Sequence, residues 1–231
     1  MSEPLPHRVR LWLPPTALLV YVVWTLLAVS GLLGPFDRLL LLDPPLDRAH
    51  GAFQLLAAVG IVGAPVVLYT GLVLLAYWAY RRRLRELALA IVLAGALSWA
   101  GITLAKIVLR MPRPPYSPDI LAVSGWGYPS GHLSAIVTVA VMVTATMMTT
   151  RQSHATTRGW RVGGVALVLL YAIDRWGLGA HWFSDIVGGA LWGRSRPAGH
   201  SCSPRCTSTA NPPPAPSIPP RTRSRSRPAP R

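Results

Sequence analysis

Three short stretches of this chain hold ionisable residues where apolar runs begin or end. They are KIVLRMPRP, which begins at Lys106, GYPSGHLS, which contains His132, and DRWGLGAHWFSD, which contains His181. Ionisable side chains at the edge of a membrane segment are costly and by default mark a functional site. These stretches are therefore the candidates for chemistry.

His181 and Asp185 are four residues apart, a spacing that places two side chains on one face of a helix. A carboxylate in that position accepts a hydrogen bond from one imidazole nitrogen, which fixes the tautomer. The other nitrogen is then free to attack or to take a proton. The same pair also fits a purely structural hydrogen bond.

Lys106 precedes Arg113 by seven residues, or two helical turns, so the two cations share a face if their helix continues that far. Pro112 should end the helix nearby. The alternative is that both side chains only anchor at lipid headgroups by snorkelling.

The GYPSGHLS stretch fits an ordinary helix start, since Ser130 can cap a helix and Gly131 permits close approach. A helix amino terminus also binds anions through its N–H groups, which would place His132 beside a bound anion. With Arg175, the candidate residues named so far supply three cations, two histidines and one carboxylate. That set can hold a phosphate, attack its phosphorus and protonate the leaving oxygen.

The apolar runs that must position these residues are too long for a soluble domain. The chain has 231 residues, of which 51% are hydrophobic and 13% are charged. A helix needs about 20 apolar residues to cross a bilayer. We therefore predict an all-α fold, a polytopic membrane helix bundle with five full spans and a truncated sixth. The five runs cover 14–33, 52–80, 87–105, 133–148 and 162–173, and the sixth covers 182–192.

Arginines predict the orientation, because positively charged loops beside membrane segments stay in the cytoplasm. The RRRLRE motif at 81–86, the 151–161 loop with three arginines and the amino terminus mark that side. The loops 34–51, 106–131 and 174–181 then face outward, and they contain or directly precede the candidate residues. We expect a multi-pass protein of the cell membrane with its site facing the periplasm or the exterior.

The chain divides into a cytoplasmic amino terminus at 1–13, a membrane domain at 14–193 and a disordered tail at 194–231. The first apolar run also resembles a secretory signal peptide, but it is longer than a signal h-region, which favours an uncleaved anchor. The tail is rich in proline and arginine and cannot form a packed core. It begins where the sixth run stops, so we hypothesise a frameshift. DNA beyond the Gly193 codon should then encode about ten further apolar residues in another frame.

The tail indicates no further chemistry. Cys202 and Cys206 are the only cysteines, and with His200 they lack the paired spacing of a zinc site. The RTRSRSR segment could touch anionic lipid. Nucleic acid is not an expected partner, because no aromatic residues alternate with these arginines.

The ordered motifs K-x6-R-P, P-S-G-H and R-x5-H-x3-D resemble those of the type 2 phosphatidic acid phosphatase superfamily, which includes the vanadium-dependent haloperoxidases. The resemblance implies that His181 is the nucleophile that forms a phosphohistidine, that Asp185 orients it, and that His132 is the general acid. It implies phosphate binding by Lys106, Arg113, Ser130, the backbone at Gly131, and Arg175. No metal or other cofactor is expected, since no clustered carboxylates could hold magnesium.

Two features depart from the pattern of this family. The third motif usually opens Ser-Arg, whereas Asp174 precedes Arg175 here. A carboxylate would repel phosphate if it pointed inward, so it either turns away or lowers activity. The truncated sixth helix also carries Asp185, and the His181 pair loses its scaffold if that helix cannot insert.

The expected function is an integral membrane phosphatase that hydrolyses a lipid phosphate or pyrophosphate at the outer leaflet. Candidate substrates by resemblance are phosphatidic acid, phosphatidylglycerol phosphate, diacylglycerol pyrophosphate and undecaprenyl pyrophosphate. One alternative is a phosphotransferase of the same superfamily. Another is a catalytically inactive membrane protein that binds anionic headgroups, which would need the cations but not His132, His181 and Asp185 together.

Overall fold

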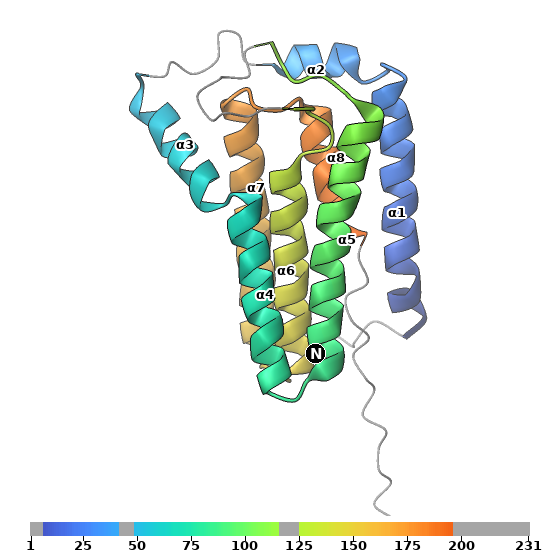
Figure 1. Ribbon diagram of the computed structural model, residues 1–231, viewed down its shortest axis with the longest axis vertical. Coiled ribbons are helices and arrows are strands. Elements are labelled where there is room, and N and C mark those ends of the chain that lie inside the picture. Colours follow the sequence, from blue (N-terminus) through green and yellow to red (C-terminus); the bar gives the residue numbers. More distant parts are fainter. Residues whose placement is uncertain (1–6, 42–48, 116–124, 196–231) are drawn as a thin grey trace, which may run out of the picture. The chain divides into compact units, whose positions relative to one another are not determined.

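The computed structural model describes residues 7–41, 49–115 and 125–195, with side chains from residue 16 onward. Every regular element within these ranges is a helix, which confirms the all-α prediction. In chain order the helices are α1 (His7–Val29), α2 (Gly34–Leu40), α3 (Gly51–Val62), α4 (Pro65–Arg81), α5 (Arg85–Leu109), α6 (Gly131–Thr149), α7 (His154–Gly177) and α8 (Phe183–Arg194) (Figure 1). The predictions for the tail, including those for Cys202 and Cys206, lie outside the described residues.

Three segments of the described chain are long and apolar enough to cross a membrane, namely Gly51–Arg81, Arg85–Leu109 and Gly131–Thr149. The part of α1 from Thr16, together with α2, makes a fourth if this bent pair counts as one span. The chain is thus an integral membrane protein. Helix α7 has 24 residues but carries charged residues near both ends, and α8 has only 12. Five full spans with a truncated sixth remain a prediction.

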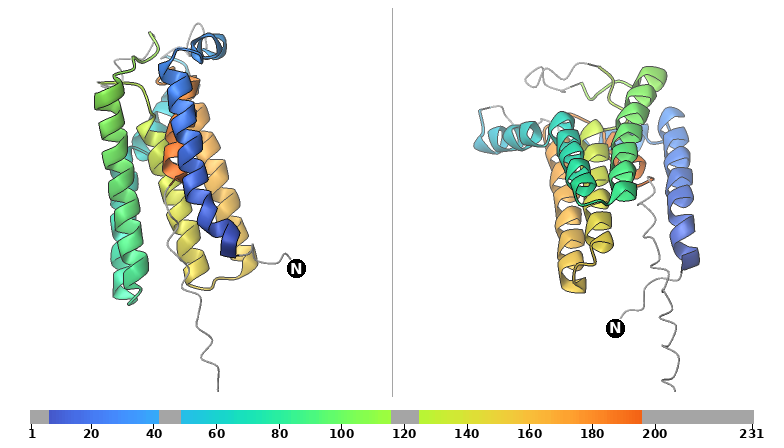
Figure 2. Two further views of the ribbon diagram at one scale, coloured as in Figure 1. Left: turned by 90° about the vertical axis from the view of Figure 1, so that its right-hand side faces the viewer. Right: turned by 60° about the horizontal axis from the view of Figure 1, so that its bottom comes forward.

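Helix α6 lies at the centre of the bundle. It contacts α4, α5, α7 and α8, and the views in Figures 1 and 2 agree on this placement. Apolar side chains from its different faces, among them Leu133, Ile136 and Met142, are buried. A helix that is apolar nearly all round requires such neighbours. Its amino terminus, which carries the GYPSGHLS motif, therefore lies among the ends of the surrounding helices.

The apolar run at 52–80 is not the continuous helix that its composition predicted. It breaks at Gly63 and Ala64 into α3 and α4. Pro65 begins α4 and has no N–H to continue the ladder from α3. Tyr171 of α7 fills the space at the break, because a Cβ on Gly63 would lie 1.7 Å from its hydroxyl oxygen. That hydroxyl donates to the carbonyl of Val59 at 3.1 Å and fastens the end of α3 to α7.

Glycines bring α8 against the start of α6. A Cβ on Gly189 would lie 2.3 Å from the carbonyl oxygen of Ser130, and one on Gly193 would lie 2.6 Å from that of Ser134. Two glycines four residues apart form a smooth strip that lets membrane helices pack closely. The 12 residues of α8 rise about 18 Å, compared with about 30 Å for the apolar part of a bilayer.

A buried cluster of hydroxyl groups ties the central helices together. The Ser98 hydroxyl of α5 lies 2.8 Å from that of Ser134 and accepts a bond from Thr138 at 3.0 Å, both on α6. Tyr69 of α4 lies 3.1 Å from the same Ser98 oxygen. The indole of Trp192 on α8 donates to the Ser98 carbonyl at 3.1 Å. Hydrogen bonds between helices stabilise packing in lipid, so this cluster fixes the helices that carry the candidate residues.

The loops that were predicted to share one side do so. The described parts of 34–51, 106–131 and 174–181 lie at one end of the bundle (Figure 1). The turn between α4 and α5 and the turn between α6 and α7 lie at the other end, and the predicted loop at 151–161 is helical from His154 onward. The candidate residues are thus gathered at a single end, which we call the outer end.

Candidate active site

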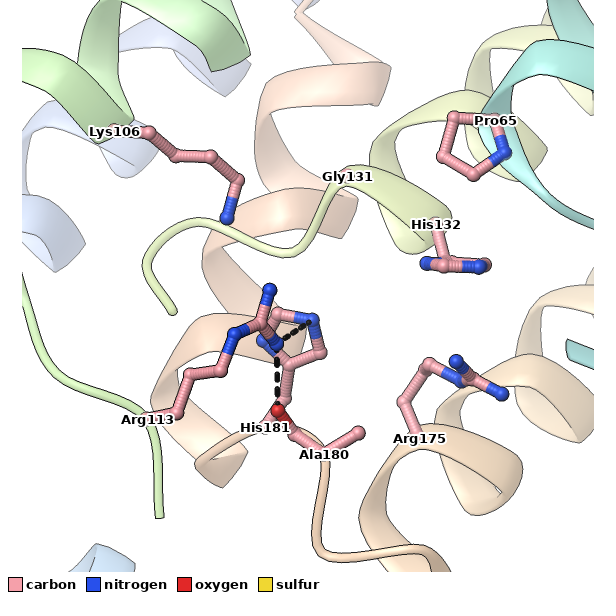
Figure 3. A pocket seen from close by; sticks show the side chains of 8 residues that line it. All are labelled: Pro65, Lys106, Arg113, Gly131, His132, Arg175, Ala180 and His181. Atoms are coloured by element: carbon pink, nitrogen blue, oxygen red, sulfur yellow. Dashed lines mark hydrogen bonds between the residues drawn. The ribbon is translucent and has the colours of Figure 1, made fainter. Parts of the chain in front are cut away.

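A cavity of about 170 Å³ opens at the outer end of the bundle. It is lined by Pro65, Lys106, Arg113, Gly131, His132, Arg175, Ala180 and His181. Six of these are residues that the sequence predicted for the site. Figure 3 shows their side chains around one space, with His132 and His181 on different sides of it.

His181 is held with one ring nitrogen turned toward this cavity. Its Nδ1 donates to Oδ2 of Asp185 at 3.1 Å, so Nε2 carries the lone pair. Arg113 donates to Nε2 from Nη1 at 3.2 Å (Figure 3). A nitrogen that can only accept fits this bond. The imidazole therefore has the tautomer and orientation of a nucleophile.

His181 and Asp185 do not share a helical face, which corrects the expectation from their spacing. Helix α8 begins at Phe183, so His181 lies in the loop before it. The two side chains meet because Asp185 is the third residue of α8 and reaches back to cap the helix start. Its Oδ2 also accepts the backbone N–H of Trp182 at 3.1 Å. The cap and the histidine partner are the same carboxylate oxygen.

The surroundings of His181 favour its neutral form. Burial lowers the pKa of the imidazole well below 6.5, and the positive charges of Arg113, Lys106 and Arg175 lower it further. The side chain is 4% exposed. A neutral imidazole is the form that can attack phosphorus.

Lys106 reaches the site from a helix, whereas Arg113 reaches it from the loop that follows. Lys106 is in the last turn of α5, which ends at Leu109, so Arg113 lies beyond the helix rather than on one face with Lys106. Lys106 donates to the carbonyls of Trp126 and Gly127 at 2.6 and 2.9 Å. Arg113 donates from Nε to Gly125 at 3.1 Å. Both cations therefore also shape the backbone that leads to GYPSGHLS.

Arg175 and Asp174 form a buried ion pair, 2 and 0% exposed. Asp174 Oδ2 accepts from Arg175 Nε at 2.5 Å. Asp174 does not line the cavity, so its carboxylate turns away, one of the two outcomes expected for this departure. Arg175 Nη2 is buried and has no partner among the described residues. Gly60 leaves the room for it, because a Cβ there would lie 1.8 Å from this nitrogen.

His132 lies in the first turn of α6 and lines the cavity across from His181. The backbone of Gly60 lies beside its ring. Ser130 immediately precedes α6 but does not line the cavity. Its hydroxyl is buried without a partner among the described residues, and its N–H donates to the carbonyl of Asp185 at 2.9 Å. That backbone bond ties the two histidine motifs together.

Sequence reasoning missed several residues that complete the site. Pro65 and Ala180 line the cavity, Gly60 makes room for Arg175, and Asp37 bonds to Ser184 beside Asp185. Glycine, proline and alanine occur throughout the apolar runs, so nothing in their types singled out these positions. Within the described residues, no group of three or more His, Cys, Asp or Glu side chains could hold a metal ion.

The fold and the cavity define an all-helical integral membrane protein with a histidine and cation site at one end of the bundle. Residues 83–196 match the model of the PAP2 superfamily. This match confirms the family that the motifs predicted, and the matched residues contain all three motifs.

The fold is also similar to that of a solved structure, described as the first transmembrane PAP2 type phosphatidylglycerolphosphate phosphatase from Bacillus subtilis. The TM-score is 0.70, with 17% sequence identity over 80% of this chain and 92% of that one. No curated protein is similar enough in sequence to match the chain.

Proposed function

We propose that this protein is a lipid phosphate phosphatase that acts at the outer leaflet of the membrane through a phosphohistidine on His181. One observation carries the proposal: Nε2 of His181, with its tautomer set by Asp185, faces a cavity lined by three cations and a second histidine. The match to the PAP2 superfamily and the apolar helices support a lipid substrate. The substrate is a phosphate monoester or pyrophosphate of a membrane lipid.

In the first step the substrate phosphate enters the cavity, where Lys106, Arg113 and Arg175 neutralise its oxygens. Nε2 of His181 attacks phosphorus, so that an N–P bond forms while the bond from phosphorus to the lipid oxygen breaks. Asp185 keeps its bond to Nδ1 and stabilises the positive charge that develops on the ring.

His132 donates a proton to the departing oxygen, which leaves as a lipid alcohol from a monoester or as a lipid monophosphate from a pyrophosphate. The negative charge of the bound phosphate favours the protonated form of this histidine. In the second step the now neutral His132 takes a proton from water. That water attacks phosphorus, the N–P bond breaks, and inorganic phosphate is released. General acid and base catalysis of this kind contributes roughly 10²- to 10⁴-fold.

The outer-leaflet location rests on the distribution of arginines. The turn after α4 carries Arg81, Arg82, Arg83 and Arg85, at the end of the bundle opposite the cavity. Positive turns stay cytoplasmic, so the cavity faces outward. An accessibility tag inserted in the 116–124 segment should react from outside intact cells, and a cytoplasmic tag would place the substrate in the inner leaflet instead.

The activity is tested on the full-length protein purified in detergent, with phosphatidic acid, phosphatidylglycerol phosphate and undecaprenyl pyrophosphate assayed in parallel. We expect phosphate release in the presence of EDTA, because the cations that the proposal uses are side chains. His181→Ala should abolish release while the protein still binds the lipid. Unchanged turnover in His181→Ala would exclude this mechanism, and binding without turnover in the unaltered protein would identify a headgroup-binding protein.

A further inference from the structure

Asp37 is a buried carboxylate at the outer end of the bundle that the proposed reaction does not use. It lies on α2 and is 8% exposed. Its Oδ1 accepts the backbone N–H of Ser184 at 2.8 Å, and its Oδ2 accepts the Ser184 hydroxyl at 2.6 Å. Both donors of one residue of α8 are therefore held by one side chain from a helix 147 residues away in the chain.

Ser184 lies next to the residue that orients His181. It is the second residue of α8 and precedes Asp185, whose Oδ2 holds His181. A negative charge at a helix amino terminus is also favourable. Asp37 therefore fixes the first turn of α8 immediately beside the carboxylate that orients His181.

Other contacts of the α1–α2 segment lie on both sides of the loop that carries His181. The indole of Trp24 donates to the Ser184 carbonyl at 3.0 Å. The indole of Trp176, in the last turn of α7, donates to the carbonyl of Leu40 at 2.7 Å. Phe36 meets Phe183 edge to face, with ring centroids 5.6 Å apart. The segment thus contacts both helices that flank the His181 loop. It does so although it lies outside residues 83–196, the part of the chain that matches the family model.

We propose that Asp37 is a positioning residue: it holds the start of α8 so that Asp185 keeps Nε2 of His181 turned into the cavity. This inference rests on the proposed function of the same site. Its physical basis is that attack requires near-contact geometry, and a shift of about 1 Å in a positioning group can cost on the order of 100-fold in rate.

The test compares Asp37→Asn, Asp37→Ala and Ser184→Ala in the full-length protein. We expect kcat to fall roughly tenfold or more in Asp37→Ala with little change in KM, since the lost bonds involve a charged group but do not touch substrate. The double variant Asp37→Ala/Ser184→Ala should be no slower than Asp37→Ala alone, because both changes break one interaction. Ser153→Ala is the matched control. Ser153 caps α7 at the other end of the bundle, where its hydroxyl accepts from Thr156 N–H at 3.1 Å, and its loss should leave kcat unchanged.

A second readout does not depend on turnover. Diethyl pyrocarbonate modifies neutral imidazole, and the modification of His181 can be followed by mass spectrometry. The reaction should be slow in the unaltered protein, severalfold faster in Asp37→Ala, and unchanged in Ser153→Ala. If no lipid phosphate is hydrolysed yet Asp37→Ala still speeds modification, the proposed function fails while the positioning of His181 by Asp37 stands. Equal modification rates would overturn the inference, as would a kcat loss in both Asp37 variants that only parallels a lower unfolding temperature.

Discussion

Arg113 donates a hydrogen bond from Nη1 to Nε2 of His181, the ring nitrogen that Asp185 leaves free. In the free protein the guanidinium therefore occupies the place that the substrate phosphorus takes in the proposed reaction. A phosphate offers charged oxygen acceptors, to which arginine binds more strongly than to a neutral nitrogen. Drawing Arg113 onto the phosphate would uncover Nε2, so the nucleophile is freed by the group that it attacks.

The pH dependence of kcat/KM should reveal the charges around His181. The pKa of this imidazole lies well below 6.5 because of burial and the neighbouring cations, so His181 stays neutral as the pH falls past 6.5. Its contribution to activity is lost only as the pH falls through the lowered pKa. Arg113→Met removes one of these cations, which raises the pKa and moves the acid limb of the profile to higher pH.

Arg110→Met serves as the control for this shift. Arg110 is exposed three residues earlier, and its Nε donates to the carbonyl of Ile107 at 3.1 Å. Its loss should leave the acid limb in place. An acid limb that does not move in Arg113→Met would mean that a group other than His181 controls it.

Asp185→Asn should lower kcat by roughly 10²- to 10⁴-fold while the protein remains folded. If the amide places its oxygen where Oδ2 accepts from both Trp182 and His181, it carries no negative charge to stabilise the positive ring that forms on attack. If its NH₂ group lies there instead, the cap is lost and the ring proton moves to Nε2, which blocks attack. Binding of orthovanadate, a phosphate analogue, should be retained because the three cations are intact. A drop in kcat of less than about tenfold would show that the carboxylate is only a structural cap.

Gly60→Ala should weaken anion binding without unfolding the protein. The new Cβ would lie 1.8 Å from Nη2 of Arg175, the far end of a flexible side chain that can move out of the cavity. Losing a hydrogen bond to a charged group costs about 1.5–3 kcal/mol, so the Kd for orthovanadate should rise roughly 10- to 100-fold. Gly71→Ala is the control, since nothing lies within 4 Å of a Cβ there. Equal Kd values for the two variants would contradict this role of Gly60.

Asp174→Ser restores the residue usual in the third motif and should make stability depend on the bound anion. Breaking a buried ion pair costs about 3–5 kcal/mol because it leaves one charge uncompensated, here that of Arg175. Phosphate or orthovanadate can supply the missing negative charge. Either anion should therefore raise the unfolding temperature of Asp174→Ser more than that of the unaltered protein. An equal rise in both proteins would show that Arg175 does not contact the anion.

Much of the candidate site could be predicted because placing its ionisable residues beside a membrane segment costs free energy. Lys106, His132 and Arg175 stand out as ionisable groups at the edges of apolar runs. The contact between His181 and Asp185 was predicted from a shared helical face, but it arises because Asp185 caps the start of α8. Spacing alone does not say where a helix begins, and the start of α8 at Phe183 turned a helical pair into a cap.

The sequence did not predict where helices are interrupted or which distant residues hold them in place. Hydrophobicity marks 52–80 as a single run, yet the break at Gly63 depends on Tyr171, which is distant in sequence. The role of Asp37 depends on Ser184 in the same way. Such contacts arise from tertiary packing, which a pattern within one segment does not contain.

The bend between α1 and α2 bears on how the protein is made. Asp37 and Ser184 are separated by 147 residues, and at about 5–20 residues per second the ribosome adds the serine roughly 7–30 s after the aspartate. A carboxylate left unpaired inside lipid for that time would oppose insertion. Because α2 turns by 87° from the axis of α1, Asp37 can wait at the hydrated surface of the membrane. The first helices thus carry a carboxylate that gains its hydrogen-bond partner only after α8, the last described helix, has been made.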